Sequence, residues 1–251
     1  MEGDTVLVDQ GVYYENLIIN KNITLASHAI YDDLSQWYEF STTFGQYEIT
    51  NENIVYTMIN GNKDTNGEDL QSTILINSPE DECISPIIFG FTITGGDGTL
   101  IPYEDDEGNE LEEIRGGGVL SYNALPTLNY NFIKDNSDDI QSGGALSLSH
   151  GDQFERVMGH TNYSFGRPRC EGDVDLSYNF YRDNDALYGN TLSTNGFEGS
   201  LDMTNSIFDV YNCPEQEVTP VWVDVEEEVE VDFQYSAGDL CSITEDVWVS
   251  P

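Results

Sequence analysis

Residues 116–136 read GGGVLSYNALPTLNYNFIKDN, and parts of this stretch recur along the chain. Its beginning returns at 143–148 as GGALSL, and its end returns at 174–184 as VDLSYNFYRDN. Two less similar copies are IIFGFTITGG at 87–96 and LDMTNSIFDVYN at 201–212. Recurrence of this kind is the sequence signature of a repeat architecture, so the copies are predicted to be successive turns of one stack.

Each copy combines a short apolar strand with a polar corner. Aligning the copies predicts one inward apolar position per copy: Ile93, Phe132, Phe180 and Ile207. A polar residue precedes each of them: Thr92, Asn131, Asn179 and Ser206. Lys134 then matches Arg182, and Asp135 and Asn136 match Asp183 and Asn184. Because such a strand is not stable alone, stacking at about 4.8 Å is expected to bury the apolar positions in one continuous core. Equivalent Asn side chains are expected to form ladders along the stack.

The N-terminal segment follows the same plan, because GDTVLVDQGVYYENLIINKNITLAS at 3–27 reads as short strands with polar corners between them. This segment, GFTITGG at 90–96 and the copy at 116–136 resemble the coils of bacterial proteins of the pectin-lyase-like superfamily. The resemblance implies an all-β fold, a right-handed parallel β-helix (a solenoid) with loop insertions. A helical period is absent, and glycines at the corners, such as Gly116 and Gly143, permit positive φ.

The charge of the chain excludes several kinds of partner. Lys and Arg number 8 against 47 Asp and Glu, which gives a net charge of -39. Nucleic acid is not expected as a partner, since phosphate binding requires clustered cations. Membrane insertion is not expected either, because no stretch is long and apolar enough. Salt or divalent cations would screen the self-repulsion of such a chain.

Four cysteines occur without a CxxC pair, which argues against a zinc site. In an extracellular protein they permit two disulfides in three pairings, of which Cys213–Cys241 is the first to expect. Four free buried thiols are the alternative. The predicted location is extracellular or at the cell surface, although the acidic opening at Met1 is no signal peptide.

One β-helix domain is predicted over residues 1–251, as a segment of a longer secreted protein. Residues 246–251, DVWVSP, are expected to begin a following module. Insertions are predicted near 28–56, 97–115 and 149–173, and function on a rigid scaffold tends to lie in such loops.

The first insertion is aromatic, and Trp37 and Tyr38 are its predicted ligand-binding residues. Aromatic rings offer a flat apolar face with a polar edge, which suits the face of a sugar ring. The alternative is that these rings pack the loop against the stack, since large exposed apolar patches are rare.

Two acidic loops are candidate Ca²⁺ sites, because Ca²⁺ takes six to eight oxygen ligands. The candidate ligands are Asp105, Asp106, Glu107 and Asn109 in one loop, and Asp64, Asn66 and Glu68 in the other. Neither loop has EF-hand spacing, and solvated acidic loops are the alternative.

The third insertion gathers scarce positive charge. Arg156 and Tyr163 are candidates for binding an anionic sugar, because Arg pairs with carboxylates in a bidentate geometry. His160, Arg167 and Arg169 are the candidate catalytic residues. The alternative is that the arginines pair with neighbouring acids. No lyase or hydrolase signature matches residue by residue, so no catalytic role is assigned.

These observations favour a non-catalytic module for adhesion, surface display or glycan binding, with a polysaccharide or cell-surface glycan as partner. One alternative is a polysaccharide lyase or glycoside hydrolase with a groove beside 149–173. The other is a stalk or filament subunit that associates end to end with its own copies.

Overall fold

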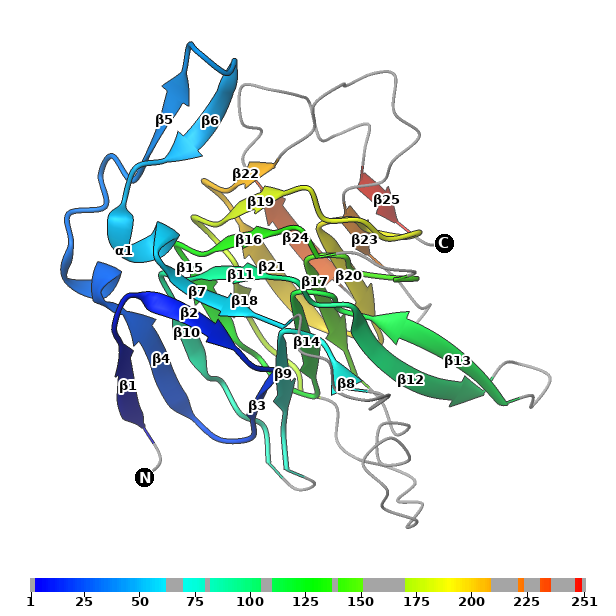
Figure 1. Ribbon diagram of the computed structural model, residues 1–251. Coiled ribbons are helices and arrows are strands. Elements are labelled where there is room, and N and C mark those ends of the chain that lie inside the picture. Colours follow the sequence, from blue (N-terminus) through cyan, green and yellow to red (C-terminus); the bar gives the residue numbers. More distant parts are fainter. Residues whose placement is uncertain are drawn as a thin grey trace.

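The computed structural model describes residues 3–61, 70–79, 82–104, 110–136, 140–150, 170–208, 221–223, 231–235 and 247–249. This part of the chain is nearly all β, as predicted (Figure 1). Its helical segments are two single turns, η1 (His28–Tyr31) and α1 (Glu52–Val55).

Three sheets of parallel strands form the body, and we name them A, B and C in the order in which the chain enters them. Sheet A consists of β1 (Asp4–Val8), β4 (Ile23–Ser27), β10 (Ile87–Phe89), β15 (Thr127–Asn129), β18 (Val174–Asp175), β21 (Gly199–Met203) and β24 (Val231–Tyr235). Sheet B consists of β2 (Gly11–Tyr14), β7 (Thr57–Asn60), β11 (Thr92–Thr94), β16 (Phe132–Lys134), β19 (Phe180–Arg182) and β22 (Ile207–Phe208). Sheet C consists of β3 (Leu17–Ile19), β9 (Ile74–Asn77), β14 (Val119–Tyr122), β17 (Leu146–Ser149), β20 (Leu192–Asn195), β23 (Val221–Val223) and β25 (Val247–Val249).

The chain visits the three sheets in turn, so that each of the first six coils adds one strand to every sheet. The fourth coil, for example, is β15, β16 and β17, and the fifth is β18, β19 and β20. Every strand therefore pairs in parallel with the equivalent strand of the preceding coil, as Ile88 of β10 does with Leu25 of β4. This stacking of repeated coils is consistent with a β-helix-like solenoid.

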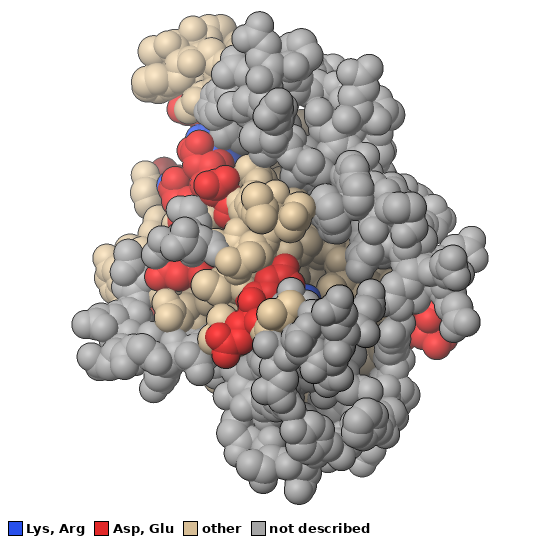
Figure 2. Space-filling model, turned by 90° about the vertical axis from the view of Figure 1, so that its right-hand side faces the viewer, with Lys and Arg blue, Asp and Glu red and all other residues tan. Residues whose placement is uncertain are grey.

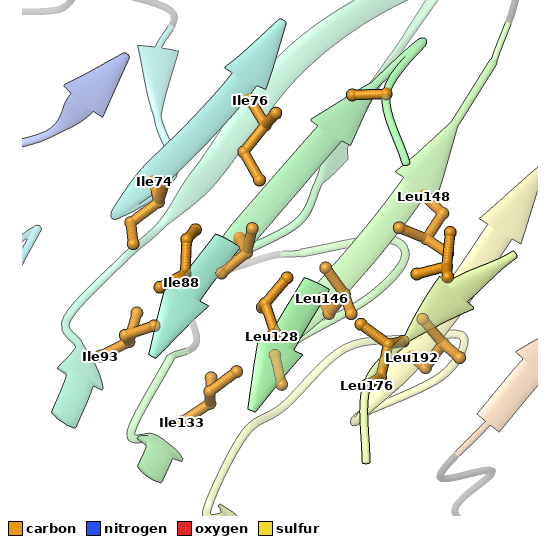
Figure 3. Packing of buried hydrophobic residues seen from close by; sticks show 14 of the residues in the cluster. Ile74, Ile76, Ile88, Ile93, Leu128, Ile133, Leu146, Leu148, Leu176 and Leu192 are labelled. Carbon is orange, nitrogen blue, oxygen red and sulfur yellow. The ribbon is translucent and has the colours of Figure 1, made fainter. Parts of the chain in front are cut away.

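The main hydrophobic core fills the space between the three sheets (Figure 3). Each sheet contributes fully buried side chains: Ile88 and Leu128 from sheet A, Ile93 and Ile133 from sheet B, and Ile74, Leu146 and Leu192 from sheet C. Burying one such side chain stabilises the fold by roughly 1.5–3 kcal/mol relative to exposing it. The core continues from coil to coil, as the repeat predicts.

The predicted register of sheet B is wrong by one residue in its third coil. Ile93 lies opposite Ile133, and Phe132 lies opposite Thr92. The residues that face the main core form the inner column: Ile59, Ile93, Ile133, Tyr181 and Phe208. Phe132, Phe180 and Ile207 lie in register as predicted, but they belong to a second cluster on the other face of the sheet, the outer column. A slip of one residue exchanges the faces, because side chains alternate along a strand.

In the third to sixth coils, the corner between sheets A and B places one residue in the left-handed backbone region. These residues are Gly90 (φ 79°), Tyr130 (φ 56°), Tyr178 (φ 58°) and Asn205 (φ 58°). The residue that follows points inward, and Asn131 Nδ2 donates to Asn179 Oδ1 at 3.1 Å. Asn136 and Asn184 make the same contact at 2.9 Å one corner further on. Both contacts confirm the predicted Asn ladders.

The insertion at 28–56 separates β4 from β7 and contains η1, α1 and an antiparallel hairpin of β5 (Tyr38–Ser41) and β6 (Gln46–Ile49). The insertion at 97–115 contains a second hairpin, β12 (Gly98–Glu104) and β13 (Glu110–Arg115), and β8 (Leu70–Gln71) pairs with its first strand. Ile101 of this hairpin packs against Leu75 and Leu120 on the outside of sheet C. Residues 151–169 of the third insertion lie outside the described residues.

A disulfide joins Cys83 and Cys170, whose Cα atoms lie 5.7 Å apart. The alternative of four free thiols is therefore wrong. The bond connects the corner before β10 with the corner before β18, which are 87 residues apart in sequence. Cys213 and Cys241, the pairing we expected first, lie outside the described residues.

The last strands continue the stack. Trp222 of β23 lies opposite Ser193 of β20, and β24 pairs with β21 in sheet A. β25 falls within residues 246–251, which we assigned to a following module, and it pairs in parallel with β23.

Candidate functional site

An aromatic strip runs along the corners between sheets A and B, where Phe89, Tyr130 and Tyr178 lie on neighbouring coils. The rings of Tyr130 and Tyr178 stack with their centroids 5.0 Å apart and an interplanar angle of 15°. Phe89 lies 5.2 Å from Tyr130 on its other side. The separations follow the spacing of parallel strands, so the repeat itself brings these rings together.

Both tyrosines occupy a backbone conformation that is costly for a bulky residue. The equivalent corner positions hold Gly90 and Asn205, the residue types that adopt positive φ most readily. A residue such as tyrosine in this region costs of order 1–3 kcal/mol, and such positions concentrate at functional sites. The geometry therefore points to the rings as the reason for tyrosine at 130 and 178.

The insertion at 28–56 packs on the outer column and borders the strip. Trp37 is only 3% exposed and its ring meets the edge of Tyr130 at 5.5 Å. Ile54 of α1 and Ala29 of η1 complete the cluster with the outer column. Trp37 therefore packs the insertion against the stack, and its faces are not presented to solvent.

The β5–β6 hairpin projects from this side of the stack and has two different faces (Figure 1). Tyr38, Phe40 and Tyr47 lie on one face, with ring centroids of Tyr38 and Phe40 at 5.6 and 5.3 Å from Tyr47. The opposite face carries Glu39 directly across from Glu48. Tyr38 is 37% exposed and Phe40 48% exposed, so the aromatic face remains partly open to solvent.

Arg182 anchors the hairpin to the stack. Its guanidinium lies over the ring of Phe180 at 4.6 Å from the centroid, and Arg182 Nη2 donates to the backbone carbonyl of Tyr47. The neighbouring cation of sheet B, Lys134, pairs with Asp135 at 2.8 Å. Both positive charges of β16 and β19 are thus engaged within the protein.

Hydrogen bonds hold the backbone before each tyrosine of the strip. Asp175 Oδ1 accepts from the backbone N–H of Ser177 at 3.0 Å and from Asn129 Nδ2 at 3.1 Å. Asn129 precedes Tyr130 and Ser177 precedes Tyr178, so one carboxylate fixes both corners. Burial raises the pKa of the Tyr130 hydroxyl, and the adjacent Tyr178 raises it further. Its phenol is therefore neutral at physiological pH.

Negative charge dominates the described surface. Figure 2 shows the face on the right-hand side of Figure 1, where Asp and Glu cover several areas and Lys and Arg only small ones. Two acids of the first insertion have a lowered pKa. Hydrogen bonds from Asn51 and Asn53 lower that of Asp32, and hydrogen bonds from Ser35 lower that of Asp33.

Of the predicted site residues, the structure describes only Trp37 and Tyr38. The other ligand-binding and catalytic candidates, Arg156, His160, Tyr163, Arg167 and Arg169, lie outside the described residues. So do the candidate Ca²⁺ ligands Asp64, Asn66, Glu68, Asp105, Asp106, Glu107 and Asn109. In the described ranges, no group of three or more His, Cys, Asp or Glu side chains converges as a metal site would. A helix able to cross a membrane is likewise not found there.

Sequence reasoning missed Tyr130 and Tyr178 as a pair. The signal was present, because YNF occurs at 130–132 and again at 178–180 in the aligned copies. In a three-residue pattern of this kind, only the three-dimensional structure shows that the Asn points inward and that the Tyr lies at the corner.

Comparisons with known proteins identify no relative whose function could be compared with that of this chain. No family model, no curated protein and no solved structure matches the chain.

Proposed function

We propose that this chain is a non-catalytic, secreted β-helix module that binds glycans through the aromatic strip. The stacked, partly exposed pair of Tyr130 and Tyr178 at costly backbone positions carries this proposal. Sugar rings present flat C–H faces and a rim of hydroxyls, and tyrosine offers a flat ring with a polar tip.

Other observations support the proposed location, the proposed handedness of the coil and the proposed role in adhesion. A disulfide such as Cys83–Cys170 forms and persists in oxidising compartments, which supports a secreted or surface location. Crossovers between parallel strands of one sheet are right-handed in about 98% of cases, which supports a right-handed coil of the pectin-lyase-like kind. Adhesion and surface display fit the same module, because a stack of coils separates its two ends and exposes its corners along the way.

Titration of neutral oligosaccharides by calorimetry tests the proposal, with cello-, xylo-, manno- and chitin hexamers as probes. Tyr178→Asn should weaken binding about two- to tenfold, since one aromatic contact contributes about 0.5–1.5 kcal/mol. The stability should change little, because Asn relieves the backbone cost while the Tyr130 contact is lost.

Tyr188→Asn is the matched control. Tyr188 is 41% exposed against 38% for Tyr178, but it lies between sheets B and C, where it bridges to Ser142. An equal loss of affinity in both variants, or no binding of any hexamer by the wild type, would refute the proposal.

We also propose that the acidic loops at 62–69 and 104–113 bind Ca²⁺. Ca²⁺ bound to the folded state should raise the melting temperature. The same rise with NaCl at matched ionic strength would show screening alone and remove calcium from the proposal.

A further inference from the structure

The aromatic strip ends at Tyr178, on the side of the next coil. That coil carries Asn205 at the equivalent corner, with φ 58° against 58° for Tyr178. Among the described residues, the ring that stacks on Tyr178 is Tyr130, and Tyr178 remains 38% exposed. Among the described residues, the stack of rings therefore stops where a small amide replaces the next ring, and a ligand ring at this level would continue it.

Acids surround this end of the strip. Asp175 of β18 lies directly opposite Asp202 of β21 in parallel register, which places both side chains on the same face of sheet A. Both are half-buried, and both are held at the corners: Asp175 accepts from Ser177 N–H, and Asp202 accepts from Thr204 N–H at 2.8 Å. Neighbouring strands lie about 4.8 Å apart, so the two carboxylates repel one another.

No positive charge offsets them from the same sheet. The strands of sheet A contain neither Lys nor Arg, and neither do the segments 126–131, 171–179 and 197–206 that form this end of the strip. The cations of the adjacent sheet are engaged elsewhere, Lys134 with Asp135 and Arg182 with the Tyr47 carbonyl. Among the described residues, a ligand at Tyr178 therefore meets negative charge that no neighbouring Lys or Arg offsets.

We infer that the glycan which stacks on Tyr178 carries no negative charge, so that uronic-acid and sulfated polysaccharides are excluded. This inference rests on the proposed glycan binding and specifies its substrate class. Carboxylate or sulfate groups near Asp175 and Asp202 would meet like charges in a partly desolvated corner, which disfavours binding. Neutral sugars are not repelled by these carboxylates, and amino sugars with a free ammonium are attracted by them.

Three hexamers of different charge test the inference by calorimetry: N-acetylglucosamine (neutral), glucosamine (cationic) and galacturonic acid (anionic). The anionic hexamer should bind at least about tenfold more weakly than the neutral one at about 0.05 M NaCl. This gap in affinity between the two hexamers should narrow at about 0.5 M NaCl, because salt screens the repulsion. Asp202→Asn should narrow the gap as well, because Asn keeps an oxygen that accepts from Thr204 and loses the charge.

Glu112→Gln is the matched control, since it removes one charge from the β12–β13 hairpin on sheet C. If Glu112→Gln narrows the gap in affinity as much as Asp202→Asn does, the preference against the anionic hexamer comes from the net charge of the protein. The inference that Asp175 and Asp202 cause it would then be wrong. Equal binding of the anionic and neutral hexamers, dependent on Tyr178, overturns the inference and leaves glycan binding standing. Absence of binding by all three hexamers overturns both.

Discussion

The outer column of sheet B comes from three of the five strands that form the inner column, yet the two columns are buried by different means. Ile133 and Tyr181 of the inner column face the other two sheets and are closed off by the coils themselves. Phe132 and Phe180 of the outer column face away from that core, and an insertion that contains Trp37 and Ile54 covers them. The two faces of one sheet thus depend on different parts of the chain.

This difference in burial distinguishes the inner column, which stabilises the stack, from the outer column, which supports the insertion next to the candidate site. The inner column joins successive coils and carries the stability of the stack, as in other repeat proteins where each repeat contacts its neighbours. The outer column instead holds an insertion in place, and the buried Trp37 of that insertion contacts the aromatic strip at Tyr130. Changes in the inner column should unfold the molecule, whereas changes in the outer column should release the insertion first.

The largest effect is expected from Ile133→Ala in the inner column. Ile133 is fully buried, so the substitution leaves a cavity between coils and should lower the free energy of unfolding by about 4 kcal/mol. Urea denaturation followed by circular dichroism measures the loss, and hydrogen exchange should quicken throughout the stack. A loss below about 1 kcal/mol would contradict the assignment of Ile133 to the main core.

Phe180→Ala in the outer column should cost somewhat less, about 3 kcal/mol, because the insertion can settle partly into the space. The distinguishing measurement is hydrogen exchange, which should quicken first in residues 28–56. Uniform acceleration over all coils would show that the two columns form one cooperative unit, and the comparison would then fail.

Arg182→Met should weaken the attachment of the hairpin by about 1–2 kcal/mol, because it removes the contact over Phe180 and the hydrogen bond to Tyr47. Lys134→Met is the control, since its pair with Asp135 is partly exposed and should contribute less than about 1 kcal/mol. Limited proteolysis of the β5–β6 hairpin reports the attachment. Equal protection in both variants would argue against Arg182 as the anchor.

The smallest effect is expected from Tyr181→Phe, which should stabilise the protein by up to about 1 kcal/mol. The Tyr181 hydroxyl is buried without a hydrogen-bond partner in the described part of the chain, and both donors of the nearby Asn179 amide already serve Leu128 and Leu176. Tyr13→Phe is the control in β2, where Tyr13 lies opposite Ile59, and it should destabilise because Tyr13 donates to the Asp9 carbonyl at 2.9 Å.

The same substitution has a pH signature. Burial raises the pKa of Tyr181 above its ordinary value of 10.0, so the folded state holds this proton more tightly than the unfolded state. The wild type should therefore lose stability as pH rises above 10, and Tyr181→Phe should lose less. Parallel pH profiles for the two proteins would place the hydroxyl in contact with water.

Much of the coil could be read from the repeat because it depends on local pattern. The matches of Phe132 with Phe180 and of Lys134 with Arg182 are correct, as are the Asn ladders and the positive φ of Gly116 and Gly143. The inward face was predicted correctly for Ile93. It was wrong for Phe132, Phe180 and Ile207, which lie on the outer face of sheet B. Strands of two to five residues with apolar side chains on both faces carry no alternation from which an inside and an outside can be told.

The candidate site was predicted only in part. Aromatic residues in the first insertion indicated a platform, but the burial of Trp37 depends on its contact with Tyr130, a residue far away in sequence. The Cys83–Cys170 disulfide was missed for a related reason, since spacing along the chain does not show which corners lie near one another.

The sequence by itself determined the repeating pattern of short strands and polar corners and the strongly acidic character of the surface. These features follow from residue types and their local order. Only the tertiary structure decided which face of sheet B the first insertion covers and which tyrosines stand together at the corners. The physical reason is that backbone pairing repeats with the coil, whereas burial of the outer column requires contacts between segments that no local period relates.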